Sequence, residues 1–232
     1  MTIIETTPTI QTEIIKDYKA FIADKNFPCI AARAAMAGGN IQCIVADNMA
    51  CPKDDRAILD FLYAFVDDYR TAPNPFHSAA IIFRGPQGID EERFDALLWQ
   101  RLQAFTDLDI QNYSWDHRVS PDTVSPTFSF SIKSEAFFIL GLHPASSRAS
   151  RRFAYPVLAF NPHQEFEKLR TANRYETMKQ VVRKRDVLYS GSINPMLNDF
   201  GEASEASQYS GKKYNDDWQC PLMIREPEVG HQ

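Results

Sequence analysis

The sequence lacks a hydrophobic run long enough to cross a bilayer. Its longest apolar stretch covers residues 136–142, whereas a membrane-spanning helix needs roughly 20 apolar residues. Residues 1–11 also lack the basic and apolar regions of a secretory signal peptide. Both absences argue against a membrane partner, and we expect a cytoplasmic protein.

Cysteine is scarce, and its four positions form no recognised motif. Cys29, Cys43, Cys51 and Cys220 include no CxxC pair, no zinc-finger spacing with histidine and no CxxCH sequence. These absences exclude a zinc finger and the covalent attachment of a c-type haem. In a cytoplasmic protein the four thiols are expected to be free.

Basic residues are not in excess, and several nucleotide and hydrolase motifs are missing. The chain has 25 basic and 30 acidic residues, a net charge of -5, whereas a protein whose main partner is nucleic acid usually shows a basic excess. It also contains no Walker loop and no GxGxxG, GxSxG or HExxH sequence. Nucleotide hydrolysis, dinucleotide-dependent redox chemistry and serine hydrolysis therefore lack support.

The chain does have the material for a large core, because 44% of its residues are hydrophobic and 16 are Phe. Hydrophobic spacing predicts both helices and strands. The predicted helices cover 9–25, a long segment that begins at 51–55, 90–107, and 161–188 with a break at 171–174; the predicted strands cover 41–46, 78–84, 127–132, 135–142 and 156–160. We expect one α+β domain over residues 1–232, in which helices flank a mixed β-sheet.

The C-terminal part departs from this regular pattern. Residues 190–222 are rich in Ser, Gly, Asn and aromatic residues and are predicted to form a long irregular segment. Loops of this length are usually functional or disordered, and the aromatic residues favour a functional one. Residues 1–8 and 223–232 are expected to be flexible.

A histidine and a cluster of arginines follow the predicted strand 135–142. His143 stands at the strand end, where Pro144 keeps the preceding backbone extended. Three serines and three arginines follow within residues 144–152, a composition suited to bidentate binding of carboxylates or phosphates. The alternative is a solvated basic turn that balances acidic neighbours.

A second histidine, His163, lies at the predicted start of the last helix. Asn161 is the predicted N-cap, Pro162 the first helical residue and Gln164 the partner in a capping box. The positive end of a helix disfavours a charged imidazole, and the neutral imidazole is the form that binds metals. The alternative is a histidine that is hydrogen-bonded at a helix start.

Two carboxyl groups and one thiol in the C-terminal segment are further candidates. Glu202 and Glu205 lie between glycines within residues 191–211, and a carboxylate there can bind a guanidinium or an amine. The alternative is a surface loop whose acids cap a short helix. Cys220, which precedes Pro221, offers either a thiolate ligand or a buried, inert thiol.

Several of these stretches resemble the YqcI/YcgG family. The resemblance rests on FPCIAARAA (27–35), GLHPASSRASRRFAYPVLAFNPHQEFEKLR (141–170), RKRD (183–186), GSINPMLNDFGEASEASQYSG (191–211) and DWQCP (217–221). It covers most of the chain from Phe27 to Pro221. Characterised relatives are haem-dependent N-hydroxylases that oxidise a nitrogen of an arginine-like guanidino substrate.

The resemblance implies a cofactor, heme b, and gives the candidate residues roles. The iron needs an axial ligand, for which His143 is preferred and His163 and Cys220 are the alternatives. The two haem propionates need cations and hydroxyl groups around them. The residues expected to supply these groups are Ser146, Ser147, Arg148, Arg151 and Arg152.

The resemblance also implies an activity, the N-hydroxylation of a guanidino or amino nitrogen of an arginine-like small molecule. Glu205 and Glu202 are expected to orient that substrate. The oxidant would be O2 or peroxide, and the reductant would come from outside, because no electron-transfer domain is visible. The alternatives are a haem-binding or gas-sensing protein without turnover, and a ligand-binding protein without haem. Whether the chain forms a homodimer is left open.

Overall fold

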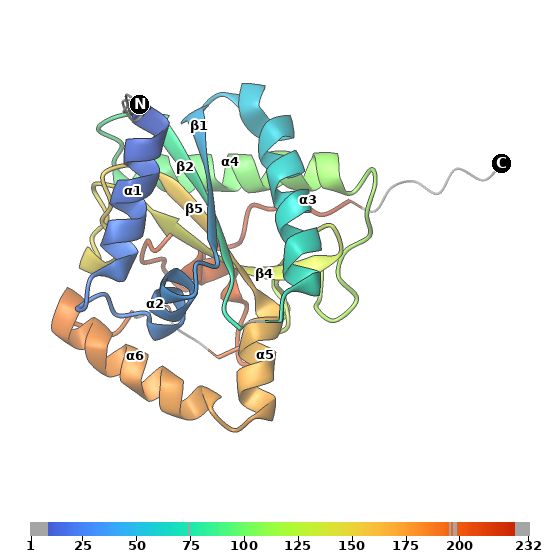
Figure 1. Ribbon diagram of the computed structural model, residues 1–232. Coiled ribbons are helices and arrows are strands. Elements are labelled where there is room, and N and C mark those ends of the chain that lie inside the picture. Colours follow the sequence, from blue (N-terminus) through green and yellow to red (C-terminus); the bar gives the residue numbers. More distant parts are fainter. Residues whose placement is uncertain (1–8, 74, 195, 197–198, 226–232) are drawn as a thin grey trace, which may run out of the picture.

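A five-stranded mixed sheet forms the centre of the molecule (Figure 1). The computed structural model describes residues 9–73, 75–194, 196 and 199–225. The strands are β1 (Ile41–Asn48), β2 (Ser78–Gly85), β3 (Phe130–Ile132), β4 (Glu135–Leu142) and β5 (Val157–Pro162). They lie in the order β1-β2-β5-β4-β3, in which β1 and β2 are parallel and the other neighbouring pairs are antiparallel.

Helices flank this sheet. In the described part of the chain they are α1 (Ile10–Ala23), α2 (Ile30–Ala37), α3 (Asp55–Thr71), α4 (Glu91–Asp109), α5 (His163–Thr171) and α6 (Tyr175–Ser190). Because successive side chains of a strand point to opposite faces, β2 divides between two cores: Ala79, Ile81 and Phe83 belong to the core with α3 and α4, and Ala80 and Ile82 to the core with α1. Sheet and helices together confirm the predicted α+β class.

The face covered by α3 and α4 is closely packed. Each helix turns an apolar stripe toward the sheet, with residues spaced three and four apart. The stripes consist of Ile58, Leu62, Phe65, Val66 and Tyr69 in α3 and of Phe94, Leu97, Leu98, Leu102 and Phe105 in α4, all of them buried. Burial contributes roughly 1.5–3 kcal/mol for each such side chain, so this face supplies much of the stability.

The opposite face has a thinner cover. α1 buries Ile14, Tyr18 and Ile22. α2, which the hydrophobic pattern did not predict, is rich in alanine and buries Ala35 alone among its residues. α6 buries none of its residues and runs along the edge of the molecule (Figure 1). Short or absent apolar side chains therefore leave unfilled space on this face.

Two predicted boundaries can be compared with the structure. The predicted break in the last helix is confirmed, because α5 ends at Thr171 and α6 begins at Tyr175. The strand predicted over 127–132 is shorter, since β3 starts only at Phe130. A turn at Ser125 accounts for the difference: its carbonyl accepts a hydrogen bond from the Phe128 N–H at 3.0 Å, so this N–H is not free to bind a neighbouring strand.

The C-terminal segment is irregular, as predicted, and contains one short 3-10 helix (Glu205–Gln208) in its described part. It lies against the end of β4, where the Gly141 N–H donates to the Tyr209 carbonyl at 2.7 Å. Trp99 of α4 stacks on the Tyr209 ring with their centroids 5.9 Å apart. The segment is therefore part of the packed structure.

The ends of the chain were expected to be flexible over 1–8 and 223–232. Residues 1–8 and 226–232 lie outside the described residues. Within the predicted range 223–232, Met223 donates its N–H to Gln103 of α4 at 2.8 Å, and its carbonyl accepts from the same side chain at 2.9 Å. Among the described residues no helix combines the length and apolar character needed to cross a membrane.

Candidate functional site

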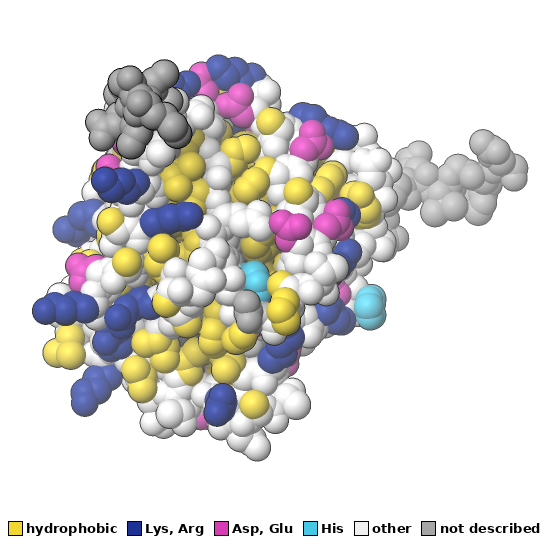
Figure 2. All heavy atoms as spheres, viewed as in Figure 1, with side chains coloured by type: hydrophobic (Ala, Val, Ile, Leu, Met, Phe, Trp, Pro, Cys, Tyr) yellow, Lys and Arg dark blue, Asp and Glu magenta, His cyan; other side chains and the backbone are white. Residues whose placement is uncertain are grey.

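A cavity of about 270 Å³ lies on the thinly covered face of the sheet. Strands β4 and β5 form its floor, and α2, α5, α6 and the C-terminal segment contribute to its walls. The alanine side chains of α2 are too short to fill the space. Figure 2 shows hydrophobic side chains across the middle of this face, with Lys and Arg side chains at its lower left margin. The volume is slightly below the roughly 300–1,000 Å³ typical of small-molecule sites.

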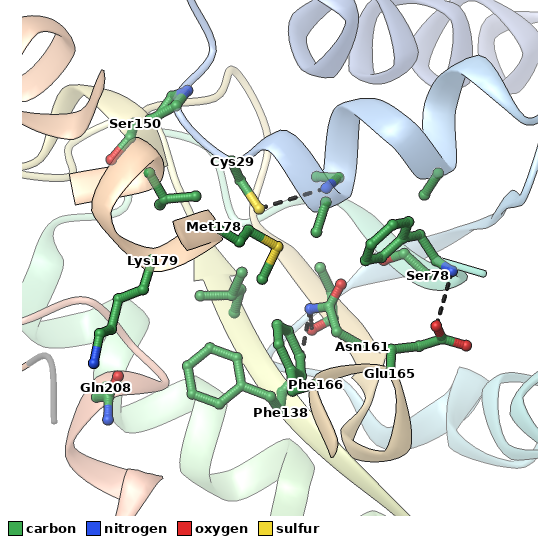
Figure 3. A pocket seen from close by; sticks show the side chains of 18 of the residues that line it. Cys29, Ser78, Phe138, Ser150, Asn161, Glu165, Phe166, Met178, Lys179 and Gln208 are labelled. Atoms are coloured by element: carbon green, nitrogen blue, oxygen red, sulfur yellow. Dashed lines mark hydrogen bonds between the residues drawn. The ribbon is translucent and has the colours of Figure 1, made fainter. Parts of the chain in front are cut away.

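Much of the wall is apolar. Phe138 of β4 and Phe166 of α5 lie edge to face with their ring centroids 6.2 Å apart, and Met178 of α6 points toward them (Figure 3). Cys29, the N-cap residue of α2, lines the same space, and burial raises the pKa of its thiol. Sequence reasoning missed these residues, although the alternation of β4 already places Phe138 and Phe137 on opposite faces.

His163 is one of two histidines in the described cavity wall; the other is His77. His163 is the first residue of α5 and is 5% exposed. Its ring lies 4.3 Å from that of Phe200, and its Nε2 has no hydrogen-bond partner in the described structure. Burial lowers the pKa of His163 to about 4, so the imidazole is neutral at physiological pH. A neutral imidazole with a free ring nitrogen can bind a metal.

The predicted capping box at this helix start is wrong. Asn161 belongs to β5, and its side-chain amide donates to the Phe138 carbonyl of the neighbouring strand at 3.2 Å. Pro162 takes the N-cap position instead, without a side-chain hydrogen bond to the helix. His163 nevertheless lies in the first helical turn, as expected.

His143 occupies a different environment. It follows β4, is fully buried, and stacks on Phe94 of α4 with the ring centroids 4.4 Å apart. Its two ring nitrogens have no hydrogen-bond partner within the described residues, and burial lowers its pKa to about 4. Although its pKa matches that of His163, His143 is not among the described residues that line the cavity.

Two of the predicted propionate-binding arginines reach the cavity but bind protein groups. Arg148 pairs with Asp186 and donates to the Ser192 carbonyl at 2.9 Å. Arg151 donates to the carbonyls of Tyr209 at 2.9 Å and Gln208 at 2.7 Å. Burial lowers the pKa of Arg151 to about 10, so it stays a cation at neutral pH. Both arginines hold the C-terminal half of the chain in place.

The other residues of that cluster lie away from the cavity. Arg152 is exposed, and its Nε donates to the Ser146 carbonyl at 3.0 Å. Ser147 donates through its N–H and its hydroxyl to Glu91, at 3.1 and 2.9 Å. Within the described wall of the cavity none of Ser146, Ser147 and Arg152 is present. The structure therefore does not bring the predicted cluster together around one site.

Glu205 is a buried carboxyl group of the cavity wall. It is 5% exposed, and its Oε1 accepts hydrogen bonds from Ser129 Oγ and Tyr209 Oη, both at 2.7 Å. Burial raises the pKa of Glu205 to about 8. The carboxyl group is therefore largely protonated at neutral pH when nothing else occupies the cavity.

Glu202 and Cys220 do not share this position. Glu202 is exposed and accepts a hydrogen bond from the Asp199 N–H at 3.2 Å. Cys220 packs against the core of the α3 and α4 face, and burial raises the pKa of its thiol to about 11. Neither residue is found in the described lining of the cavity, so the two carboxyl groups are not paired and the thiol is not near His163.

Cations on α5 and α6 were also missed by sequence reasoning. Arg170, Lys179 and Arg183 line the cavity, and Figure 3 shows the Lys179 side chain extending along its wall toward Gln208. Lys179 and Arg183 are four residues apart, which places them on one face of α6. This spacing was visible in the sequence, but it did not show which face of the helix meets the cavity.

The described residues contain no cluster of three or more His, Cys, Asp or Glu side chains that could hold a metal ion. His163 is one potential ligand, and His77 of the same wall, whose Nδ1 is also buried without a hydrogen-bond partner, is another. A metal bound there would need its remaining ligands from a molecule that enters the cavity.

Comparison with known proteins gives two matches. A family model described as the YqcI/YcgG family matches residues 18–223. The chain is also similar to "Uncharacterized protein YqcI" of Bacillus subtilis (strain 168), with 28% identity over 231 residues that cover 94% of this chain and 90% of that protein. No solved structure matches.

Proposed function

The chain belongs to the YqcI/YcgG family, and from this membership and the geometry of its cavity we propose that it is a haem-dependent N-hydroxylase. The observation that carries the proposal is His163, a buried imidazole in the cavity wall whose Nε2 has no hydrogen-bond partner among the described residues and lies 3.8 Å from the Glu167 carboxylate. In this proposal His163 is the axial ligand of heme b. It replaces His143, the preferred ligand at the level of the sequence.

The residues of the cavity suit such a cofactor. A haem has a flat apolar body and two carboxylates, and its porphyrin supplies four of the ligands of the iron, so that one protein side chain completes the proximal side. Phe138 and Phe166 offer aromatic surface to the body, and His163 offers the ligand. When bound, haem supplies the activation of O2 or peroxide that oxygen transfer to a nitrogen requires.

We assign Glu205 to the binding of a cationic substrate. Two hydroxyl groups fix Oε1, and Oε2 accepts no hydrogen bond from the described residues, which leaves it for a guanidinium or an amine. A cation beside the carboxyl group favours its charged form. Because burial raises the pKa of Glu205 to about 8, binding of a cationic substrate would release a proton, and affinity would increase with pH up to that value.

The haem part of the proposal is tested by reconstitution with haemin. Absorption spectra of the ferric and ferrous-CO forms would be recorded for the wild type and for His163→Ala, His143→Ala and Cys220→Ala. We expect a Soret band typical of histidine-ligated haem that only His163→Ala loses. A red-shifted CO band lost with Cys220→Ala, or no haem uptake by any protein, would contradict the assignment.

The activity is tested with the reconstituted protein, arginine, O2 and a chemical reductant, because the described chain offers no redox partner of its own. The expected product carries one additional oxygen atom on a guanidino nitrogen, detected by mass spectrometry. Glu205→Gln should weaken substrate binding and leave the Soret band unchanged. Equal affinity in this variant would remove Glu205 from the site, and haem uptake without product would favour a haem-binding protein without turnover.

A further inference from the structure

Cationic side chains outnumber carboxyl groups in the cavity wall. The described lining contains five cations, Arg148, Arg151, Arg170, Lys179 and Arg183, and three carboxyl groups, Glu165, Asp186 and Glu205. A chain with an overall net charge of -5 therefore turns a positive surface toward this cavity. Such a local excess favours a ligand that carries negative charge.

Most of these cations already bind protein groups. They are Arg148 with Asp186, Arg151 with main-chain carbonyls, Arg170 with Glu167, and Lys179 with Glu176 and Asp199. Arg170 also lies over the Tyr175 ring, 4.2 Å from its centroid. An additional anion would have to compete with these contacts.

Arg183 differs from the other four. Its Nε is buried without a hydrogen-bond partner, and within the described part of the chain it forms no ion pair. Its charge helps to lower the pKa of Asp199, but no ion pair or hydrogen bond joins these two described residues. A guanidinium is always charged and offers donors in a fork that matches a carboxylate. A cation of this kind at a cavity wall is expected to bind an anion.

We propose that Arg183 binds a carboxylate group of the molecule that occupies the cavity. Under the proposed function, on which this inference rests for the identity of that molecule, the carboxylate comes either from a haem propionate or from the α-carboxylate of an amino-acid substrate. Lys179, one turn earlier on α6, is paired with Glu176 and Asp199, so Arg183 supplies the charge for this carboxylate. Carboxylate binding, which the sequence analysis expected of Arg148, Arg151 and Arg152, is thus assigned to a residue of α6.

The experiment compares Arg183→Met with Lys184→Met. Both variants remove one positive charge from neighbouring positions of α6, but Lys184 is exposed and Arg183 lines the cavity. Circular dichroism checks that both variants fold. Two pairs of probes are titrated into each protein: haemin against haemin dimethyl ester, whose propionates are masked, and arginine against agmatine, which lacks the carboxylate.

In one of the two pairs, we expect the wild type and Lys184→Met to bind the probe with the free carboxylate about tenfold or more tightly than its partner. This ratio corresponds to the free energy of one charge-assisted hydrogen bond. Arg183→Met should lose that preference, and Arg183→Lys should recover part of it. Loss in the haemin pair identifies a propionate, and loss in the arginine pair identifies the substrate carboxylate.

Two results separate this inference from the proposed function. If the wild type takes up no haemin, the proposed function fails, while the arginine pair still tests Arg183 in the haem-free protein. If Arg183→Met keeps the wild-type preference in both pairs, or if the wild type shows no preference in either, Arg183 does not bind a carboxylate and the inference is overturned.

Discussion

The two faces of the sheet are covered to different degrees, and two neighbouring residues of β4 show the contrast. Phe137 is fully buried on the α3 and α4 face, where its ring lies 6.2 Å from that of Phe65. Phe138 points to the other face, is only partly buried and borders the cavity. One face therefore provides stability through close packing, and the other leaves apolar surface available to a ligand.

The two buried histidines repeat this contrast. His143 and His163 have the same lowered pKa of about 4, and the Nε2 of each has no hydrogen-bond partner among the described residues. His143 is stacked against Phe94 in the packed core, whereas His163 lines the cavity. Burial and a nitrogen without a hydrogen-bond partner do not by themselves distinguish the two histidines; only His163 lines the cavity.

The largest effect on stability is expected at the two neighbouring phenylalanines of β4. Phe137→Ala should lower the free energy of unfolding by about 3–5 kcal/mol, because it opens a cavity in a packed core. Phe138→Ala should cost about 1–2 kcal/mol, since part of its ring surface is already accessible. Denaturant unfolding of both variants measures the difference, and equal losses would show that both faces are packed alike.

A smaller effect is expected at the arginines that follow β4. Arg151→Met leaves the buried carbonyls of Gln208 and Tyr209 without their donor, which should cost about 2–4 kcal/mol. Arg152→Met, at the exposed neighbouring position, should change the free energy of unfolding by less than about 1 kcal/mol. Thermal and denaturant unfolding check both values; a tolerated Arg151→Met would mean that Arg151 is free to bind a ligand.

Glu205 is expected to make the free energy of unfolding depend on pH. Its pKa rises from the ordinary 4.5 to about 8 in the folded chain, so the folded state keeps a proton that the unfolded state has lost. The stabilisation is complete below pH 4.5 and is lost as pH rises toward 8. From pH 5 to pH 8 the wild type should therefore lose about 1–3 kcal/mol relative to Glu205→Gln.

The two buried histidines change the free energy of unfolding with pH in the opposite direction. Because the folded pKa of His143 and His163 is lowered from 6.5 to about 4, both remove stability as pH falls from 6.5 toward 4. They are present in the wild type and in Glu205→Gln, so their contribution cancels in the difference between the two proteins. Parallel pH profiles of the wild type and Glu205→Gln would contradict the raised pKa of Glu205.

The parts of the fold that follow strong periodicity were predictable. The stripes of α3 and α4, such as Ile58 with Leu62 and Leu98 with Leu102, indicate helices because one face is apolar and the other polar. α2 was not predictable in this way, because its eight residues are too few to repeat an apolar stripe. The capping box at Asn161 failed because the amide found a partner on β4, a neighbour that local sequence does not reveal.

The candidate site was predictable only in part. His163, Arg148, Arg151 and Glu205 were identified, and all four line the cavity. Their partners were not visible in the sequence: whether an arginine is free depends on contacts far along the chain, such as that of Arg148 with Asp186. For the same reason the pattern around His143 could not show that its ring turns into the packed core.

The most direct test of haem ligation by His163 is rescue of the missing ligand by imidazole. His163→Gly, and His143→Gln as the matched change in the packed core, would each be reconstituted with haemin, with and without added imidazole. We expect His163→Gly to lose the spectrum of histidine-ligated haem and to regain it with imidazole, while His143→Gln keeps the wild-type spectrum throughout. Loss of the spectrum in His143→Gln together with a wild-type spectrum in His163→Gly would contradict the assignment of the cavity as the haem site.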